Sequence, residues 1–343
     1  LALVVVSVIT VLVTSLNRVS IAVERDKKTS EALAIAKEAL IGWSAKRGND
    51  TGTARPGDFP CPDRDDDGNA EGSCSTAGGT SIGRLPWKTL GIERLTDGNS
   101  EALWYALSNN FRISAAIINS NSRGQLLVYG PDGSTLITES GYDAIAVIFA
   151  PGPAAGAQVR NTAAEKNAVV NYLDTANGRN NASTGGPFIA GDKSDTFNDR
   201  LVFITTKDLI PVVEQRVAGE VKRVLTNYFN DSGCNCYPWA DTVPTAADYD
   251  ANYGLNRGWL PYTALPFDWS GTYRLPDWFM QNDWYKLIYY SVAQNYTQVP
   301  GDCYSCIDST LRVDGVSGTR ALFFMPGPPI GTLTRTVTNL AHY

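Results

Sequence analysis

The first 16 residues carry no charged side chain, no glycine and no proline. Their only polar side chains belong to Ser7, Thr10, Thr14 and Ser15. Sixteen helical residues span about 24 Å, slightly less than the roughly 30 Å of a bilayer's hydrocarbon core. Because a helix that is apolar on every side has to be buried in lipid or among similar helices, this segment constrains the fold more than any other.

Residues 24–47 continue the helical pattern with a different character. They contain no proline and are rich in alanine, leucine, lysine and glutamate, which favour helix. Apolar side chains recur with spacings of three and four, the period of one helix face, at Leu33, Ala36, Leu40 and Trp43. Gly48 then acts as a stop signal. We predict that residues 1–47 form one helix about 70 Å long, apolar at first, whose later half packs its stripe on a globular head.

A cleaved secretory signal peptide is the simpler explanation of an apolar N-terminal run. It requires a basic leader and a small-residue cleavage site soon after the run. Asn17 and Arg18 follow the run instead, and the helical pattern continues beyond them. A single-pass anchor of a surface protein is the other alternative, although such an anchor usually ends in a flexible linker.

Residues 1–47 resemble the N-terminal helix of type IV pilins and the related pseudopilins. The resemblance implies a structural subunit that is held in the inner membrane through residues 1–16 and is extracted by the pilus assembly machinery. It then joins identical subunits in an extracellular helical filament at the cell surface. The apolar helices bundle in the filament core, and the resemblance assigns to that core Leu1, Val4, Val5, Val8, Ile9, Val11, Leu12 and Leu16.

Two features depart from the pilin pattern. Most pilins carry a glutamate near the start of the apolar run and a glycine or proline partway along it. Here the first acidic residue is Glu24, and no helix breaker precedes Gly42. A minor pseudopilin at the tip of a pilus or of a type II secretion machine lacks the early glutamate, and it is the second interpretation.

The composition narrows the classes of function. The chain has 343 residues, 29 of them basic and 35 acidic, and its net charge of −6 offers no general attraction for nucleic acid. His342 is the only histidine, which excludes a two-histidine metal site and a c-type haem motif. We therefore expect a structural protein and not an enzyme. The alternative from another class is a membrane-anchored surface hydrolase with a carboxylate pair, or a carbohydrate-binding protein.

An acidic loop follows the helix, within residues 48–83, which we expect to be loop throughout. Three aspartates alternate and Gly68 follows them, as at the start of calcium loops. The twelfth position holds Cys74 where an EF-hand has glutamate, so the loop is not an EF-hand. Clustered acids repel each other unless a cation intervenes; a solvated acidic turn is the alternative. We predict a calcium site whose ligands are Asp63, Asp65, Asp67, Asn69 and Glu71.

The head, residues 48–343, carries three further stretches that resemble large prepilin-type proteins of bacteria. They are Pro60-Cys61-Pro62-Asp63, Gly83-Arg84-Leu85-Pro86-Trp87 and Trp104-Tyr105-Ala106. The resemblance names a family and no reaction. Together with the N-terminal helix it implies an α+β fold: a long pilin-like helix packed on a head whose C-terminal region is rich in aromatic residues and stapled by disulfides.

The pattern of the head predicts a modest, largely antiparallel sheet. Strands are predicted at residues 125–129, 144–149, 201–204, 321–324 and 333–337. A short helix is predicted from Glu101, with Leu103, Leu107 and Phe111 buried, and a long one over residues 205–229. Glu214 falls on the predicted solvated face of that long helix. Residues 156–193 are predicted to be an exposed, insertion-like loop, and we divide the head into residues 48–230 and 231–343.

Six cysteines allow 15 pairings, so spacing alone does not fix them. Disulfides are the default in an extracytoplasmic protein. We predict that Cys61 and Cys74 close the acidic loop, and that the Cys234/Cys236 pair is linked to the Cys303/Cys306 pair. A four-thiolate zinc site built from the last four cysteines and a redox pair at Cys303 and Cys306 are the alternatives.

Residues 237–290 are dense in tryptophan and tyrosine, interleaved with proline and aspartate. Such side chains suit a sugar-binding or partner-binding surface. A loop-rich region held together by aromatic packing and disulfides is the alternative that we favour.

Overall fold

The computed structural model describes residues 2–48, 54–74, 80–113, 117–231, 233–242, 254–261, 274–297 and 311–336, and side chains from Val19 onward. The chain forms two compact units. Unit 1 contains Leu1–Trp43, Phe59–Ile113 and Arg123–Thr205; unit 2 contains Ser44–Asp58, Ser114–Ser122 and Thr206–Tyr343. The fold belongs to the mixed α/β class, with an N-terminal helix and antiparallel sheets. The predicted boundary at residue 230 stays a prediction.

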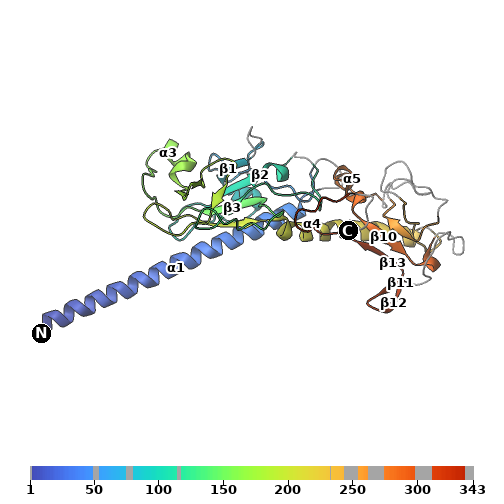
Figure 1. Cartoon of the computed structure of the whole chain (residues 1–343), viewed down its shortest axis with the longest axis horizontal. Helices are drawn as coiled ribbons and strands as arrows, with labels where there is room; N and C mark the ends of the chain where they lie inside the picture. The colour runs from blue at the N-terminus through green and yellow to red at the C-terminus, as the bar shows by residue number, and fades with distance from the viewer. Residues whose placement is uncertain are drawn as a thin grey trace. The chain divides into compact units, whose positions relative to one another are not determined.

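Helix α1 runs without a break over Ala2–Lys46 and confirms the single long N-terminal helix (Figure 1). Gly48, at φ 113°, takes a left-handed conformation just beyond its end. The side chains of residues 2–18 and the whole of Leu1 lie outside the described part, so the assignment of filament-core residues stays a prediction. Among the described residues, no helix combines the length and the apolar composition needed to span a membrane.

Residues 19–28 of α1 are all exposed, and Thr29 is the first buried residue of the helix. From there the predicted stripe is buried: Leu33 is 2% exposed, and Ala36 and Leu40 are fully buried. Trp43, the fourth member of the stripe, is only half-buried. The helix therefore has one part that projects and one part that packs within unit 1.

A four-stranded antiparallel sheet forms the centre of unit 1, in the order β1-β2-β4-β8. Side chains of one face, including Trp104, Val147 and Phe149, join the main hydrophobic cluster with Leu126, Val128 and Phe188. The other face is buried as well, at Tyr105, Ile148 and Ile204. The strands are β1 (Thr80–Arg84), β2 (Trp104–Ser108), β4 (Ala146–Ala150) and β8 (Arg200–Ile204).

The sheet confirms the strands predicted at residues 144–149 and 201–204, but two other predictions were wrong. The segment from Glu101 forms β2 instead of a helix. All five residues of β2 are buried, so the spacing of Leu103, Leu107 and Phe111 reflects burial on every side, not a helix face. In addition, β1 begins at Thr80, inside the stretch predicted to be loop.

Short elements complete unit 1. The predicted strand at residues 125–129 shrinks to β3, which pairs in parallel with β7. The prediction of an exposed loop at 156–193 was wrong, because Tyr172, Leu173 and Phe188 from this stretch belong to the core. The remaining elements are α2 (Trp87–Leu90), η1 (Asn109–Phe111), β3 (Val128–Tyr129), α3 (Ala163–Asn167), η2 (Val169–Asn171), β5 (Thr175–Ala176), β6 (Arg179–Asn180) and β7 (Phe188–Ile189).

Unit 2 contains the long helix predicted over residues 205–229, which is α4 (Thr206–Asp231). Its predicted apolar face is buried throughout, from Val213 to Tyr228. Glu214 is buried too, contrary to the predicted solvated face. Its carboxylate accepts hydrogen bonds from Ser120 Oγ and, at 2.9 Å, from Gly327 N, which gives the buried charge two donors.

Unit 2 also contains a three-stranded antiparallel sheet, in the order β13-β10-β9. It confirms the strand predicted at residues 321–324, whereas residues 333–336 form no strand. Its elements, with the neighbouring hairpin β11-β12, are β9 (Arg257–Trp259), α5 (Asp277–Gln281), η4 (Trp284–Lys286), β10 (Tyr289–Val292), η5 (Gln294–Tyr296), β11 (Leu311–Val313), β12 (Val316–Thr319) and β13 (Ala321–Phe324).

A buried amide joins three separate segments of unit 2. Asn282 Oδ1 accepts hydrogen bonds from Arg55 Nη1 and Ile118 N, both at 2.9 Å. Its Nδ2 donates to Trp278 O at 2.7 Å. Trp278 and Trp284, which flank Asn282 in the sequence, are fully buried. For these residues the aromatic density serves packing.

Candidate functional site

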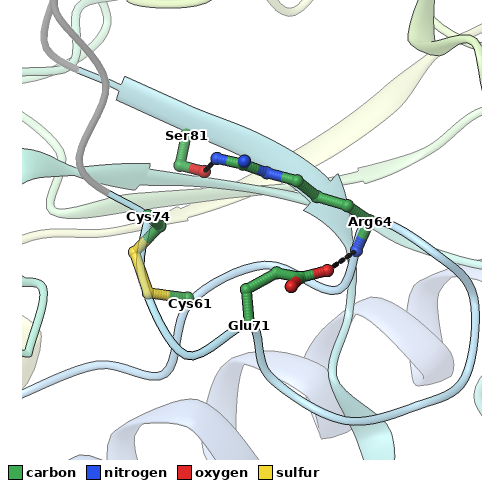
Figure 2. The surroundings of a disulfide bond; sticks show 5 residues. All are labelled: Cys61, Arg64, Glu71, Cys74 and Ser81. Carbon is green, nitrogen blue, oxygen red and sulfur yellow. Dashed lines mark hydrogen bonds between the residues drawn. A yellow bond between two sulfur atoms is a disulfide. The ribbon is translucent and has the colours of Figure 1, made fainter.

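The acidic loop is held between a disulfide and strand β1 of unit 1 (Figure 2). Cys61 and Cys74 are joined with their Cα atoms 5.5 Å apart, which is the pairing favoured from the sequence. Asp63 N donates to Arg84 O at 2.9 Å, and Arg84 N donates back to Asp63 O at 2.6 Å. Both ends of the loop are therefore fixed.

Asp63 organises the loop from inside. Its side chain is fully buried, and Oδ1 accepts hydrogen bonds from Asp65 N at 3.1 Å and Asp66 N at 2.7 Å. Oδ2 accepts from Gly68 N at 2.7 Å. Burial raises the pKa of Asp63, and the amide donors of Gly68 and Asp66 oppose that rise. Both oxygens of Asp63 are thus already used to shape the turn.

Gly68 is required at the turn for two reasons. Its φ of 87° lies in the left-handed region. A Cβ at this position would lie 2.5 Å from the Trp87 ring. The turn therefore packs tightly against the indole of Trp87, which restrains its shape.

Three of the five predicted calcium ligands converge. Oxygen atoms of Asp63, Asp65 and Glu71 lie within 4.8 Å of one another, and no other trio of acidic, Cys or His ligand atoms meets this closely among the described residues. Glu71 Oε1 also accepts from Arg64 N at 3.1 Å (Figure 2). The trio offers carboxylate oxygen, which suits a hard cation such as Ca²⁺.

The other two predicted ligands pair with each other. Asp67 Oδ1 accepts from Asn69 N at 2.6 Å, and Asp67 Oδ2 accepts from Asn69 Nδ2 at 2.9 Å. These bonds lower the pKa of Asp67, whose carboxylate is solvent-exposed. Asp67 and Asn69 are therefore not part of the converging trio in this arrangement.

Basic side chains neutralise part of the negative charge of the acidic loop. The sequence analysis did not identify these basic partners. Arg94 Nη2 donates to both carboxylate oxygens of Asp66 at 2.9 Å, and Arg84 Nε lies 3.5 Å from Asp66 Oδ1. Lys88 Nζ donates to Asp67 O. The cation that the repulsion calls for is, at Asp66, supplied by arginine side chains from elsewhere in the chain, which weakens the argument from repulsion for a metal ion.

Residues 79–83, Gly-Thr-Ser-Ile-Gly, match the letters of the nucleophile elbow of hydrolases. Ser81 nevertheless lies in the middle of β1 and is 2% exposed. Its hydroxyl accepts a hydrogen bond from Arg64 Nη2 at 2.9 Å (Figure 2). A nucleophile elbow places serine at an exposed turn between strand and helix, so Ser81 does not have that setting.

The prediction for Cys234 and Cys236 was wrong. The two residues form a disulfide with each other, across Asn235. Asn235 adopts φ 50°, which brings the two Cα atoms to 5.1 Å, within the range of a direct bond. Neither sulfur is left to link with Cys303 or Cys306, and these two residues lie outside the described part of the chain.

No family model, no curated protein and no solved structure matches this chain.

Proposed function

We propose that this chain is a pilin-like structural subunit that assembles through α1 into an extracellular filament. The observation that carries the proposal is that α1, although unbroken, has an exposed part followed by a part that packs within unit 1. Residues 19–28 of α1 are exposed along their whole length, and packing begins only at Thr29. A helix that merely supported the head would have no need of this projecting part.

The projecting part exposes apolar side chains. Val19, Ile21 and Val23 are 62%, 53% and 61% exposed, and the residues before them in the sequence, 1–16, include no charged side chain. Burying apolar surface yields about 25 cal/mol per Å², so helices of this kind gain free energy by packing together. In the proposed filament this gain replaces burial in the inner membrane, from which the assembly machinery extracts the subunit.

The acidic loop has a supporting part in this proposal. Asp63, Asp65 and Glu71 take up Ca²⁺, which stiffens a loop that the Cys61–Cys74 disulfide already closes. The head then stays folded outside the cell, where disulfides persist.

A photo-cross-linking experiment tests the assembly surface. A photoreactive amino acid is placed at Val23 of α1, and a matched control is placed at Val170 of η2; both positions are 61% exposed. We expect cross-linked dimers of this chain from Val23 in material sheared from the producing cells, and none from Val170.

Cross-links from Val23 to a different protein would instead support the tip pseudopilin, whose neighbours are not copies of itself. The absence of cross-links at Val23, with monomers that stay in the membrane fraction, would contradict assembly and support the anchored surface protein.

A further inference from the structure

The described part of the chain contains two disulfides that differ in exposure. Cys61 and Cys74 are each 2% exposed, so both are shielded from reagents in solution. In the Cys234–Cys236 disulfide of unit 2, Cys236 is also 2% exposed, whereas Cys234 is exposed. Thiol–disulfide exchange begins when a thiolate attacks one sulfur, and its rate depends on access to that sulfur. Of these two bonds, the second therefore offers the better entry point, at Cys234.

The Cys234–Cys236 disulfide also closes the smaller ring. Its cysteines are two positions apart, whereas Cys61 and Cys74 are 13 positions apart. A cross-link removes less conformational freedom from the unfolded chain when the loop that it closes is shorter. Asn235, between the two cysteines, adopts a φ of 50°, which is uncommon for a residue other than glycine. Stabilisation of the fold is therefore a weak reason for this bond.

The two cysteines lie in different surroundings. The segment after Cys236 is held in place, because Tyr237 N donates to Tyr296 O at 2.7 Å and Trp239 is buried. Cys234 lies in the exposed stretch that follows α4. When the bond opens, the fixed Cys236 stays one residue away from Cys234, so the pair is positioned to close again.

A positive charge lies close to Tyr237, the residue after Cys236. The guanidinium of Arg320 is 5.3 Å from the ring centre of Phe229 and 5.2 Å from that of Tyr296. Burial raises the pKa of Tyr237, and the charge of Arg320 opposes that rise. A neighbouring cation stabilises a thiolate, so this charge favours Cys236 as a leaving group.

We propose that the Cys234–Cys236 disulfide is a redox-active site that oxidises a dithiol. A thiolate of the dithiol attacks Cys234 Sγ, the bond between the two cysteines breaks, and Cys236 leaves as a thiolate that takes up a proton. The second thiol of the dithiol then loses its proton and attacks the sulfur of the first. A disulfide forms within the dithiol, and Cys234 leaves as a thiolate and is protonated. Two electrons and two protons thus pass from the dithiol to the chain.

Timed reduction of the full chain in neutral detergent tests the proposal, with dithiothreitol as the probe. Samples are quenched, their free thiols are alkylated, and the alkylated cysteines are located by peptide mass spectrometry. We expect Cys234 and Cys236 to become alkylated about ten times faster than Cys61 and Cys74, or more, because exchange follows access to the sulfur. Equal rates for the two pairs would overturn the proposal.

Two double variants show which disulfide oxidises the probe. Changing both Cys234 and Cys236 to serine should abolish the rapid oxidation of one equivalent of dithiothreitol. Changing both Cys61 and Cys74 to serine, the matched control, should preserve it. Rapid oxidation that survives the first change would overturn the proposal. The timed reduction of the parent needs no variant, so it decides the matter even where a cysteine change disturbs folding.

Single variants show which sulfur is attacked. In Cys236→Ser the remaining Cys234 thiol should form a mixed disulfide with oxidised glutathione. In Cys234→Ser the buried Cys236 thiol should react about ten times more slowly, or less. The opposite order would contradict the assignment of Cys234 as the point of entry. Circular dichroism of each variant checks that the chain is folded.

Discussion

Thr29 Oγ1 accepts a hydrogen bond from Gly98 N at 2.9 Å and donates one to Arg25 O at 2.8 Å. This contact joins the loop before β2 to α1 at the residue where the helix becomes buried. Gly98 lies directly on the helix backbone, because an added Cβ would come within 2.3 Å of Arg25 O. The contact marks the boundary between the projecting and the packed parts of α1.

The first prediction concerns this boundary. Gly98→Ala should destabilise the head by about 2–4 kcal/mol, because backbone on both sides prevents relief of the clash. Gly219→Ala is the matched control: Gly219 is an exposed position in α4 with open space around it, where alanine should stabilise by up to about 1 kcal/mol. Chemical denaturation followed by circular dichroism measures both. Equal effects of the two changes would contradict the close approach.

The second prediction concerns the disulfide of the acidic loop. The bond joins two cysteines that are 13 positions apart in the sequence and are each 2% exposed. The double change of Cys61 and Cys74 to serine should lower the free energy of unfolding by about 3 kcal/mol. Differential scanning calorimetry, with and without reducing agent, checks this value. If a reducing agent shifts the double variant as much as the parent, the effect of reduction lies at cysteines other than Cys61 and Cys74.

The third prediction concerns calcium. If the trio binds Ca²⁺, an excess of about 100-fold over the dissociation constant should add about 2.7 kcal/mol to the stability of the head. The Asp65→Asn and Glu71→Gln double variant should lose this gain, because it removes two of the three converging carboxylates. Thermal shift with calcium or chelator measures it, and Asp314→Asn is the control. A calcium response that survives in the double variant would place the ion elsewhere.

The fourth prediction is a pH dependence at Asp199. The unfolded chain loses this proton near the ordinary aspartate pKa of 3.8, whereas the folded chain keeps it up to a pKa of about 8. Between these values the folded state binds the extra proton, so its stability falls as the pH rises. Asp199→Asn should remove this slope and stabilise the protein at pH 7 by on the order of 3 kcal/mol.

Urea unfolding at pH 5 and pH 8 tests the fourth prediction. The parent should lose more stability than the variant between the two pH values. Parallel losses in the two proteins would show that Asp199 ionises normally in the folded chain.

The long, regular elements could be predicted from the sequence because their period is local. The stripe of α1 and the apolar face of α4 repeat every three or four residues, and both are buried as expected except at Trp43, which is half-buried. The same period led to a wrong prediction for the segment that forms strand β2. Burial on both faces removes alternation, and Leu103, Leu107 and Phe111 then matched a helix by coincidence.

The candidate sites were harder to predict because their partners are distant in sequence. Arg94 lies 28 residues from Asp66, and Gly327 lies 113 residues from Glu214. A pattern of neighbouring residues does not predict pairs that are so far apart in the sequence. The disulfide across Asn235 is different: it depends on a backbone conformation with positive φ, for which the asparagine was the available signal.

The central claim is that the projecting part of α1 joins copies of this chain. The most direct measurement is electron microscopy and sedimentation of material from cells that produce either the full chain or a chain that begins at Lys28. We expect filaments that sediment from the full chain, and a folded, non-sedimenting head from the shortened chain. Filaments of normal abundance from the shortened chain would contradict the account.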